Sequence, residues 1–187
     1  MRDVAGGLPD EATASPLVVE RYDAGRHKKA LVALLLELAA VDPPYPSRLS
    51  SDGTAESLES WLAAEPGAVD WVATRDGEVL GHVRVTDPHP YLVAHGPAMG
   101  VEIDAQTHGE VVKFFVSTVC RRDGVGRSLL TTAMRHIESS ERRPVLAVLD
   151  GSTGAIAFYN AMGLVEIGAF DGEEGLNHVF MGSPEGA

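Results

Sequence analysis

The basic, glycine-rich turn RRDGVGRSLL at residues 121–130 carries the clearest chemical signal in this sequence. Gly124 and Gly126 stand where an apolar, helix-like pattern begins, so the turn would open a helix. A helix N-terminus directs free backbone N–H groups and the positive end of the helix dipole at one spot, where anions bind. Glycines allow a ligand to approach the backbone, and the turn adds three cations, Arg121, Arg122 and Arg127. The sequence therefore predicts an anion-binding turn.

The spacing of this turn excludes two common phosphate motifs. A Walker loop requires G-x-x-x-x-G-K-[ST], and the turn contains no lysine. The dinucleotide fingerprint requires a third glycine at the position of Leu129. A tight strand-to-helix connection that holds no ligand stays open as the alternative.

A second segment relates the turn to a known family. VCRRDGVGRSLL resembles the [Q/R]-x-x-G-x-[G/A] signature of the GCN5-related N-acetyltransferase (GNAT) family, and LAVLDGSTGAIAFYNAMGLVEIG is similar to the family's L-x-V-x-x-x-N-x-x-A-I-x-x-Y-x-x-x-G-F segment. The matching residues are Arg121, Gly124, Gly126, Leu146, Val148, Ala155, Ile156, Tyr159 and Gly163. Leu164 replaces the family's phenylalanine. The resemblance covers roughly residues 70–182 and implies acetyl-CoA as co-substrate, with no metal.

The resemblance also implies which residues hold acetyl-CoA. Backbone amides of the turn would cradle its pyrophosphate, with contacts expected from Arg121, Arg122, Asp123, Gly124, Val125, Gly126, Arg127 and Ser128. The preceding strand would expose its backbone to pantetheine at Phe114, Phe115 and Val116, next to a bulge expected at Ser117 and Thr118. Ala155 and Ser152 would complete the site from the short helix. Asp123 is a departure from the family, and Ser152 replaces its asparagine while keeping the ability to cap a helix.

Acetyl transfer to an amine requires an acid for the leaving thiolate and a base for the amine. By resemblance, the Tyr159 hydroxyl serves the departing sulfur. An alkylammonium with a pKa near ~10 is almost fully charged at pH 7, so a base must remove its proton. Some relatives use a glutamate at the position of Ala147, so that role cannot be carried over. Glu110 at the start of the central strand is the best replacement, and two further candidates follow it, Glu102 and Asp104.

The elements that must position these groups follow from hydrophobic periodicity. The pattern predicts strands, helices and one hairpin around Asp76-Gly77 in the order β-α-α-β-β-β-α-β-α-β-β. The expected ranges are strand 16–23, helix 24–42, helix 55–65, hairpin 70–87, strand 110–119, helix 126–140, strand 145–150, helix 153–162, and strands 164–170 and 177–182. Residues 88–109 contain three prolines and read as an irregular insertion.

These elements indicate an α/β chain of the α+β type, a GNAT-like mixed, curved sheet of six to seven strands flanked by about four helices. Its 187 residues suit one domain, expected over 16–182, with flexible tails at 1–15 and 183–187.

The amino-acid composition limits the classes of molecule that the chain is expected to bind. The formal net charge is -12, from 27 acidic and 15 basic residues, which disfavours nucleic acid and anionic membranes and favours a small cationic amine as acceptor. No apolar run is long enough to span a membrane, and the single cysteine, Cys120, suits a reducing cytoplasm. A homodimer is compatible with the family resemblance. Two alternatives stay open: a non-catalytic acyl-CoA-binding or sensing module, and a transferase acting on a protein N-terminus or lysine.

Overall fold

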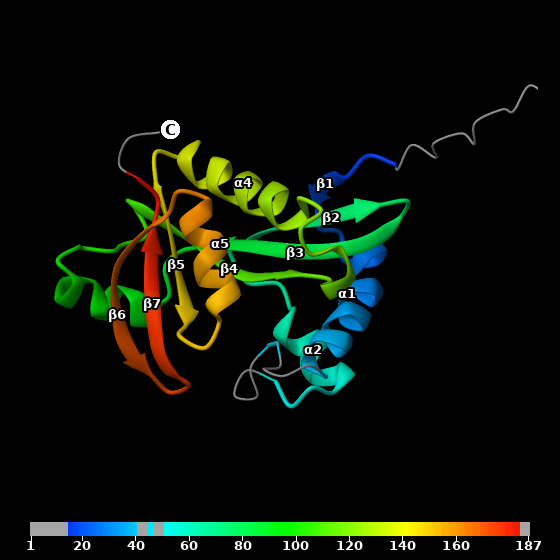
Figure 1. Ribbon diagram of the computed structural model, residues 1–187, viewed down its shortest axis with the longest axis horizontal. Helices are drawn as coiled ribbons and strands as arrows, with labels where there is room; N and C mark the ends of the chain where they lie inside the picture. The colour runs from blue at the N-terminus through cyan, green and yellow to red at the C-terminus, as the bar shows by residue number, and fades with distance from the viewer. Residues whose placement is uncertain (1–14, 41–44, 47–50, 184–187) are drawn as a thin grey trace, which may run out of the picture.

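A seven-stranded mixed sheet organises the computed structural model, which describes residues 15–40, 45–46 and 51–183 (Figure 1). The strand order is β1-β2-β3-β4-β5-β7-β6, and β4–β5 is the parallel pair in an otherwise antiparallel arrangement. The strands are β1 (Val18–Arg21), β2 (Val69–Arg75), β3 (Glu78–Thr86), β4 (His108–Val116), β5 (Arg143–Leu149), β6 (Val165–Gly172) and β7 (Gly175–Met181). The helices are α1 (Ala24–Ala39), α2 (Ala55–Trp61), α3 (Pro90–His95), α4 (Val125–Glu138) and α5 (Thr153–Ala161), with short 3₁₀ turns η1 (Gly96–Met99) and η2 (Thr118–Cys120).

The predicted fold class and element order are confirmed, with one correction. The insertion at 88–109 is not irregular throughout, because it contains α3 and η1 and raises the number of α-helices in the described residues to five. Pro90 is at the first turn of α3, where a missing N–H costs nothing, and His89 caps the helix by accepting a hydrogen bond from the Tyr91 N–H. The proline therefore starts a helix in a segment whose prolines predict an irregular loop.

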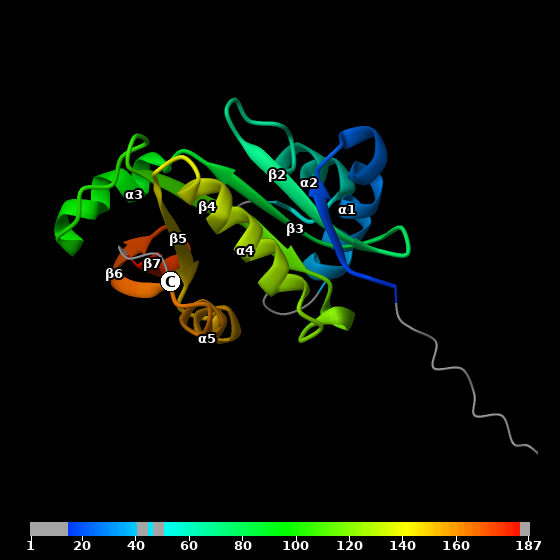
Figure 2. The same cartoon turned by 90° about the horizontal axis from the view of Figure 1, so that it is seen from above.

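Helices cover both faces of the sheet (Figure 2). On one face, α1 and α2 bury an apolar stripe that includes Leu31, Leu35 and Leu58 against β2, β3 and β4. On the other face, α4 packs Leu129, Leu130, Ala133 and Ile137 into the main core, which α5 also joins. The sheet thus lies between α4, which begins at the glycine turn, and α2 with its adjoining loops. None of the helices in the described ranges has the length and apolarity needed to cross a membrane.

The central strand β4 carries a bulge, though not where the sequence predicts it. Phe115 pairs with His82 and Val112 pairs with Arg84, so two residues of β4 face the single residue between them on β3. The extra residue lies at Lys113–Phe114, and Lys113 has a left-handed φ of 48°. The expectation of a bulge at Ser117 and Thr118 is therefore wrong, because β4 ends at Val116 and these residues lead into η2.

Candidate active site

The parallel strands β4 and β5 separate soon after they meet. Their register contains three pairs, of which the last joins Glu110 to Val145. Beyond Glu110, β4 pairs with β3 and β5 pairs with β7, so the facing edges of β4 and β5 have no strand partner between them. An extended ligand that carries amide groups can hydrogen-bond to such an edge as an added strand would. Phe114, Phe115 and Val116 lie on this part of β4.

The glycine turn leads from β4 into α4 and presents free backbone N–H groups. Gly124 is the N-cap residue with a φ of 80°, and no side chain caps the helix. The Ser128 N–H donates to the Gly124 carbonyl at 2.9 Å, which leaves the N–H groups of Val125, Gly126 and Arg127 without a partner inside the helix. Arg122 is also left-handed, at a φ of 76°. Successive free amides at a helix start suit a phosphate group.

The unexpected acidic residue of the turn has a partner. Asp123 lies 3.7 Å from the guanidinium of Arg75, at the end of β2. This ion pair offsets the negative charge that Asp123 brings to the turn. Arg75 could not be predicted as part of the turn, because nothing in a hairpin sequence shows that its end reaches the start of α4.

Tyr159 of α5 is buried between its own helix and strands β4 and β7. Its side chain is 7% exposed, and its ring packs against Phe114, Phe158 and Phe180 at centroid distances of 6.2, 5.7 and 5.8 Å. Its hydroxyl has no hydrogen-bond partner among the described residues. Burial raises the pKa of Tyr159, so the hydroxyl keeps its proton and can donate it.

The start of α5 departs from the expected cap. Ser152 is the N-cap residue, yet its side chain makes no capping hydrogen bond. Its carbonyl instead accepts from the N–H groups of Ala155 and Ile156, at 2.9 and 3.0 Å. The hydroxyl of Ser152 is therefore not used by the helix.

Glu110 occupies the last β4–β5 pair and is 1% exposed. The backbone N–H of His89 donates to its Oε2 at 2.7 Å, and the Tyr91 hydroxyl donates to its Oε1 at 2.9 Å. Burial raises the pKa of Glu110 to about 7, against the opposing effect of these two hydrogen bonds. A carboxyl group with such a pKa can take and release a proton near neutral pH.

The two other candidate carboxylates differ from Glu110 in their surroundings. Asp104 accepts hydrogen bonds from the Thr107 and Gln106 N–H groups at 2.9 and 2.7 Å, and these contacts lower its pKa. Its carboxylate holds a turn, which makes it a weak base. Glu102 is exposed.

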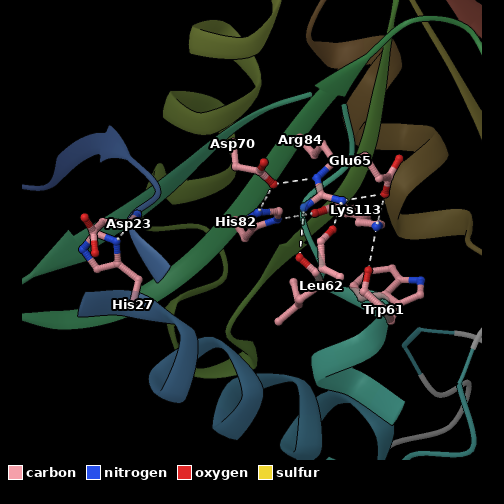
Figure 3. A network of polar contacts seen from close by, with 10 residues as sticks. Asp23, His27, Trp61, Leu62, Glu65, Asp70, His82, Arg84 and Lys113 are labelled. Carbon is pink, nitrogen blue, oxygen red and sulfur yellow. Dashed lines mark hydrogen bonds and ion pairs between the residues drawn. The ribbon is translucent and has the colours of Figure 1, made fainter. Parts of the chain in front are cut away.

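A buried polar network supports the bulge of β4 (Figure 3). The imidazole of His82 bridges the Lys113 carbonyl and the Asp70 carboxylate, both at 2.8 Å, and Arg84 donates to the same Asp70 oxygen at 2.7 Å. The Lys113 ammonium binds the Trp61 carbonyl at 2.6 Å and also the Glu65 carboxylate. The network thus ties the left-handed residue of β4 to β2, β3 and the end of α2. His82 and Arg84 alternate with valines in a buried strand, and this alternation is the sequence signal for the network.

Aromatic side chains adjoin the network on the α2 side. The ring of Tyr45 lies 5.7 Å from those of both Trp61 and Phe115. Phe115 also stacks on His82 at 5.2 Å. No group of three or more His, Cys, Asp or Glu side chains in the described part of the chain is arranged to hold a metal ion.

Comparison with known proteins agrees with this geometry. The family model described as "Acetyltransferase (GNAT) family" matches residues 33–164. An acetyltransferase of the GNAT family from Staphylococcus aureus is 17% identical with a TM-score of 0.61, over 89% of this chain and 98% of that chain. Arabidopsis thaliana NAA60 in complex with acetyl-CoA is 13% identical with a TM-score of 0.64, over 89% and 97%. The PaiA N-acetyltransferase of Thermoplasma acidophilum in complex with coenzyme A is 12% identical with a TM-score of 0.63, over 89% and 98%. No protein of curated function matches the chain.

Proposed function

The chain belongs to the acetyltransferase (GNAT) family, whose chemistry is acyl transfer that depends on acetyl-CoA, and we propose that it acetylates the primary amine of a small cationic molecule. The observation that carries the proposal is the separation of β4 from β5 directly beside the free amides that begin α4. The free edge of β4 offers a surface for an extended, amide-containing chain. The start of α4, which follows β4 along the chain, offers a surface for a diphosphate. Acetyl-CoA has these two parts in that order.

The residues of the turn fit the diphosphate. The N–H groups of Val125, Gly126 and Arg127 would bind its oxygens, and the side chains of Arg121, Arg122 and Arg127 would add positive charge at the rim. Asp123 would point to Arg75, as its ion pair suggests. Ser128, in the first turn of α4, can add a hydroxyl contact.

The edge of β4 fits the pantetheine arm. Backbone groups of Phe114, Phe115 and Val116 would hydrogen-bond to its amides and direct a donor at the acetyl carbonyl. Ala155 and Ser152 on α5 would line the opposite side. The thiol end of the arm would then reach the space between β4 and Tyr159.

The reaction needs two proton transfers, one from the amine and one to the departing sulfur, and we assign them to Glu110 and Tyr159. When the amine nitrogen forms a bond to the acetyl carbon and the carbon–sulfur bond breaks, Glu110 receives the proton that the amine loses, and Tyr159 donates a proton to the departing sulfur. The pKa of Glu110, about 7, and the protonated state of buried Tyr159 match these roles. Acetyl-CoA supplies the activated acyl group.

The choice of acceptor rests on charge. A formal net charge of -12 favours a cationic amine over an anionic acceptor. A protein N-terminus or lysine carries the same amine chemistry and is the second acceptor class to be tested.

Release of coenzyme A tests the proposal. Purified protein and acetyl-CoA are mixed with a panel of diamines, amino sugars, amino acids and lysine peptides, and free thiol is followed in a colorimetric assay. The proposal predicts turnover with a small cationic amine that falls about 10²-fold in Tyr159→Phe and is kept in the control Glu138→Gln, at an exposed glutamate that ends α4. Binding of acetyl-CoA without turnover on any amine would instead support a non-catalytic acyl-CoA-binding module. Turnover confined to the peptides would move the acceptor class to proteins.

A further inference from the structure

The carboxylate of Glu110 is closed off from direct contact with a substrate. The residue is 1% exposed, and each of its two oxygens already accepts a hydrogen bond. The donor to Oε2 is a backbone N–H of His89, which cannot pass a proton on. The donor to Oε1 is the Tyr91 hydroxyl, which can give its proton to the carboxylate and accept another on the same oxygen.

Helix α3 holds Tyr91 between the buried carboxylate and the surface. The Tyr91 side chain is 37% exposed, in contrast to Glu110 below it. Its ring packs against the rings of His89 and Phe170, at centroid distances of 4.4 and 5.6 Å. Contacts on two sides orient the ring, and the hydroxyl at its end donates to Glu110 from a helix that lies nearer the surface.

We propose that Tyr91 relays the proton of the acceptor amine to Glu110, an inference that rests on the proposed acetyltransferase function. As the nitrogen–carbon bond forms, the amine N–H gives its proton to the Tyr91 oxygen, and the Tyr91 hydroxyl gives its own proton to Glu110 Oε1. Tyr91 ends the step neutral and Glu110 ends it protonated. Glu110 later returns the proton to solvent by the same route in reverse.

The electrostatics of the site suit a relay that never leaves Tyr91 ionised. Burial, and then the charge of Glu110, raise the pKa of Tyr91, so a free tyrosinate is strongly disfavoured. Both protons must therefore move together. The negative charge of Glu65, which lies beyond the end of α2, also raises the pKa of Glu110 and so favours its protonated form.

Tyr91→Phe tests the relay, because it keeps the ring and removes the hydroxyl. Val93→Ala, at an exposed position of the same helix, controls for disturbance of α3. In the free protein, the Glu110 pKa is followed by carbon NMR of labelled glutamate. It should rise in Tyr91→Phe, since the lost hydrogen bond stabilises the carboxylate, and should stay in place in Val93→Ala. An unchanged Glu110 pKa would mean that the contact does not exist in solution and would overturn the relay.

The rate of turnover then distinguishes a Tyr91 that transfers the proton from one that only adjusts the pKa of Glu110. With an accepted amine at pH 8.5, where Glu110 is ionised, the relay predicts that kcat falls about 10²-fold in Tyr91→Phe while acetyl-CoA affinity is unchanged. A plateau kcat within about threefold of wild type, on a pH profile displaced to higher pH, would show that Tyr91 only adjusts the Glu110 pKa and would refute the relay. If the wild-type protein turns over no amine at all, the proposed function fails and the relay fails with it.

Discussion

Replacing Glu110 with glutamine is expected to change how the stability of the free protein depends on pH. The unfolded chain loses the Glu110 proton near pH 4.5, whereas the folded protein retains it up to about 7. Folded wild type therefore binds more protons than the unfolded chain between these values, and its stability falls as the pH rises through this window. The pKa difference corresponds to a loss of about 3 kcal/mol, complete above pH 7. Glutamine does not ionise and escapes this loss.

Urea denaturation at pH 5 and pH 8 measures the effect. The free energy of unfolding of Glu110→Gln relative to wild type should increase by about 2.5 kcal/mol between the two pH values, because wild type has already lost part of the total below pH 5. The hydrogen bonds that glutamine loses, to His89 and Tyr91, are disturbed at both pH values and largely cancel in this difference. Glu102→Gln, at an exposed glutamate, should give changes within about 0.5 kcal/mol at either pH. Parallel pH curves for wild type and Glu110→Gln would refute the assignment of a buried carboxyl with a raised pKa.

Three further substitutions test other parts of the site. Tyr159→Phe should lower kcat by about 10²-fold with acetyl-CoA binding and melting temperature retained, because the hydroxyl makes no hydrogen bond to any described residue; a parallel loss of binding would contradict a role in proton donation. Gly124→Ala should lower the free energy of unfolding by about 1–2 kcal/mol in thermal melts, because Gly124 has a φ of 80°. Gly126→Ala should be tolerated, because an added Cβ would meet its nearest neighbours at 3.5–3.6 Å. Equal losses of stability in the two variants would contradict this difference. Asp70→Ala should destabilise the protein by about 3 kcal/mol in urea, because it leaves the fully buried Arg84 without that partner, and a cost below 1 kcal/mol would show that the network is not needed.

Local signals in the sequence were sufficient for most of the elements. The 3.6-residue period of α1 and the Asp76-Gly77 turn between β2 and β3 require no knowledge of distant residues, and both predictions are confirmed. The glycine turn at the start of α4 also lies where the sequence predicts it. These features depend on neighbours along the chain, which a sequence displays directly.

Features that depend on distant contacts were missed or misplaced. The bulge of β4 lies at Lys113 because its carbonyl binds His82 and its ammonium binds the end of α2, and neither contact is visible in the strand sequence. The contact between Tyr91 and Glu110 joins residues 19 positions apart. It exists only because Pro90 begins a helix in a segment whose prolines suggested a loop. Glu110 as a base candidate and Tyr91 as a pocket residue could both be named from the sequence, but the hydrogen bond that joins them could not.

Binding of acetyl-CoA tests the central claim most directly. Thermal melting of the purified protein is measured alone and with acetyl-CoA, ATP or NAD at equal concentrations. At about 100 times Kd, acetyl-CoA should add about 2.7 kcal/mol and raise the midpoint by several degrees, while ATP and NAD produce no comparable rise. A folded protein whose midpoint is unchanged by acetyl-CoA would mean that the turn at Gly124 and the separated edges of β4 and β5 do not hold this co-substrate, and the account would be wrong.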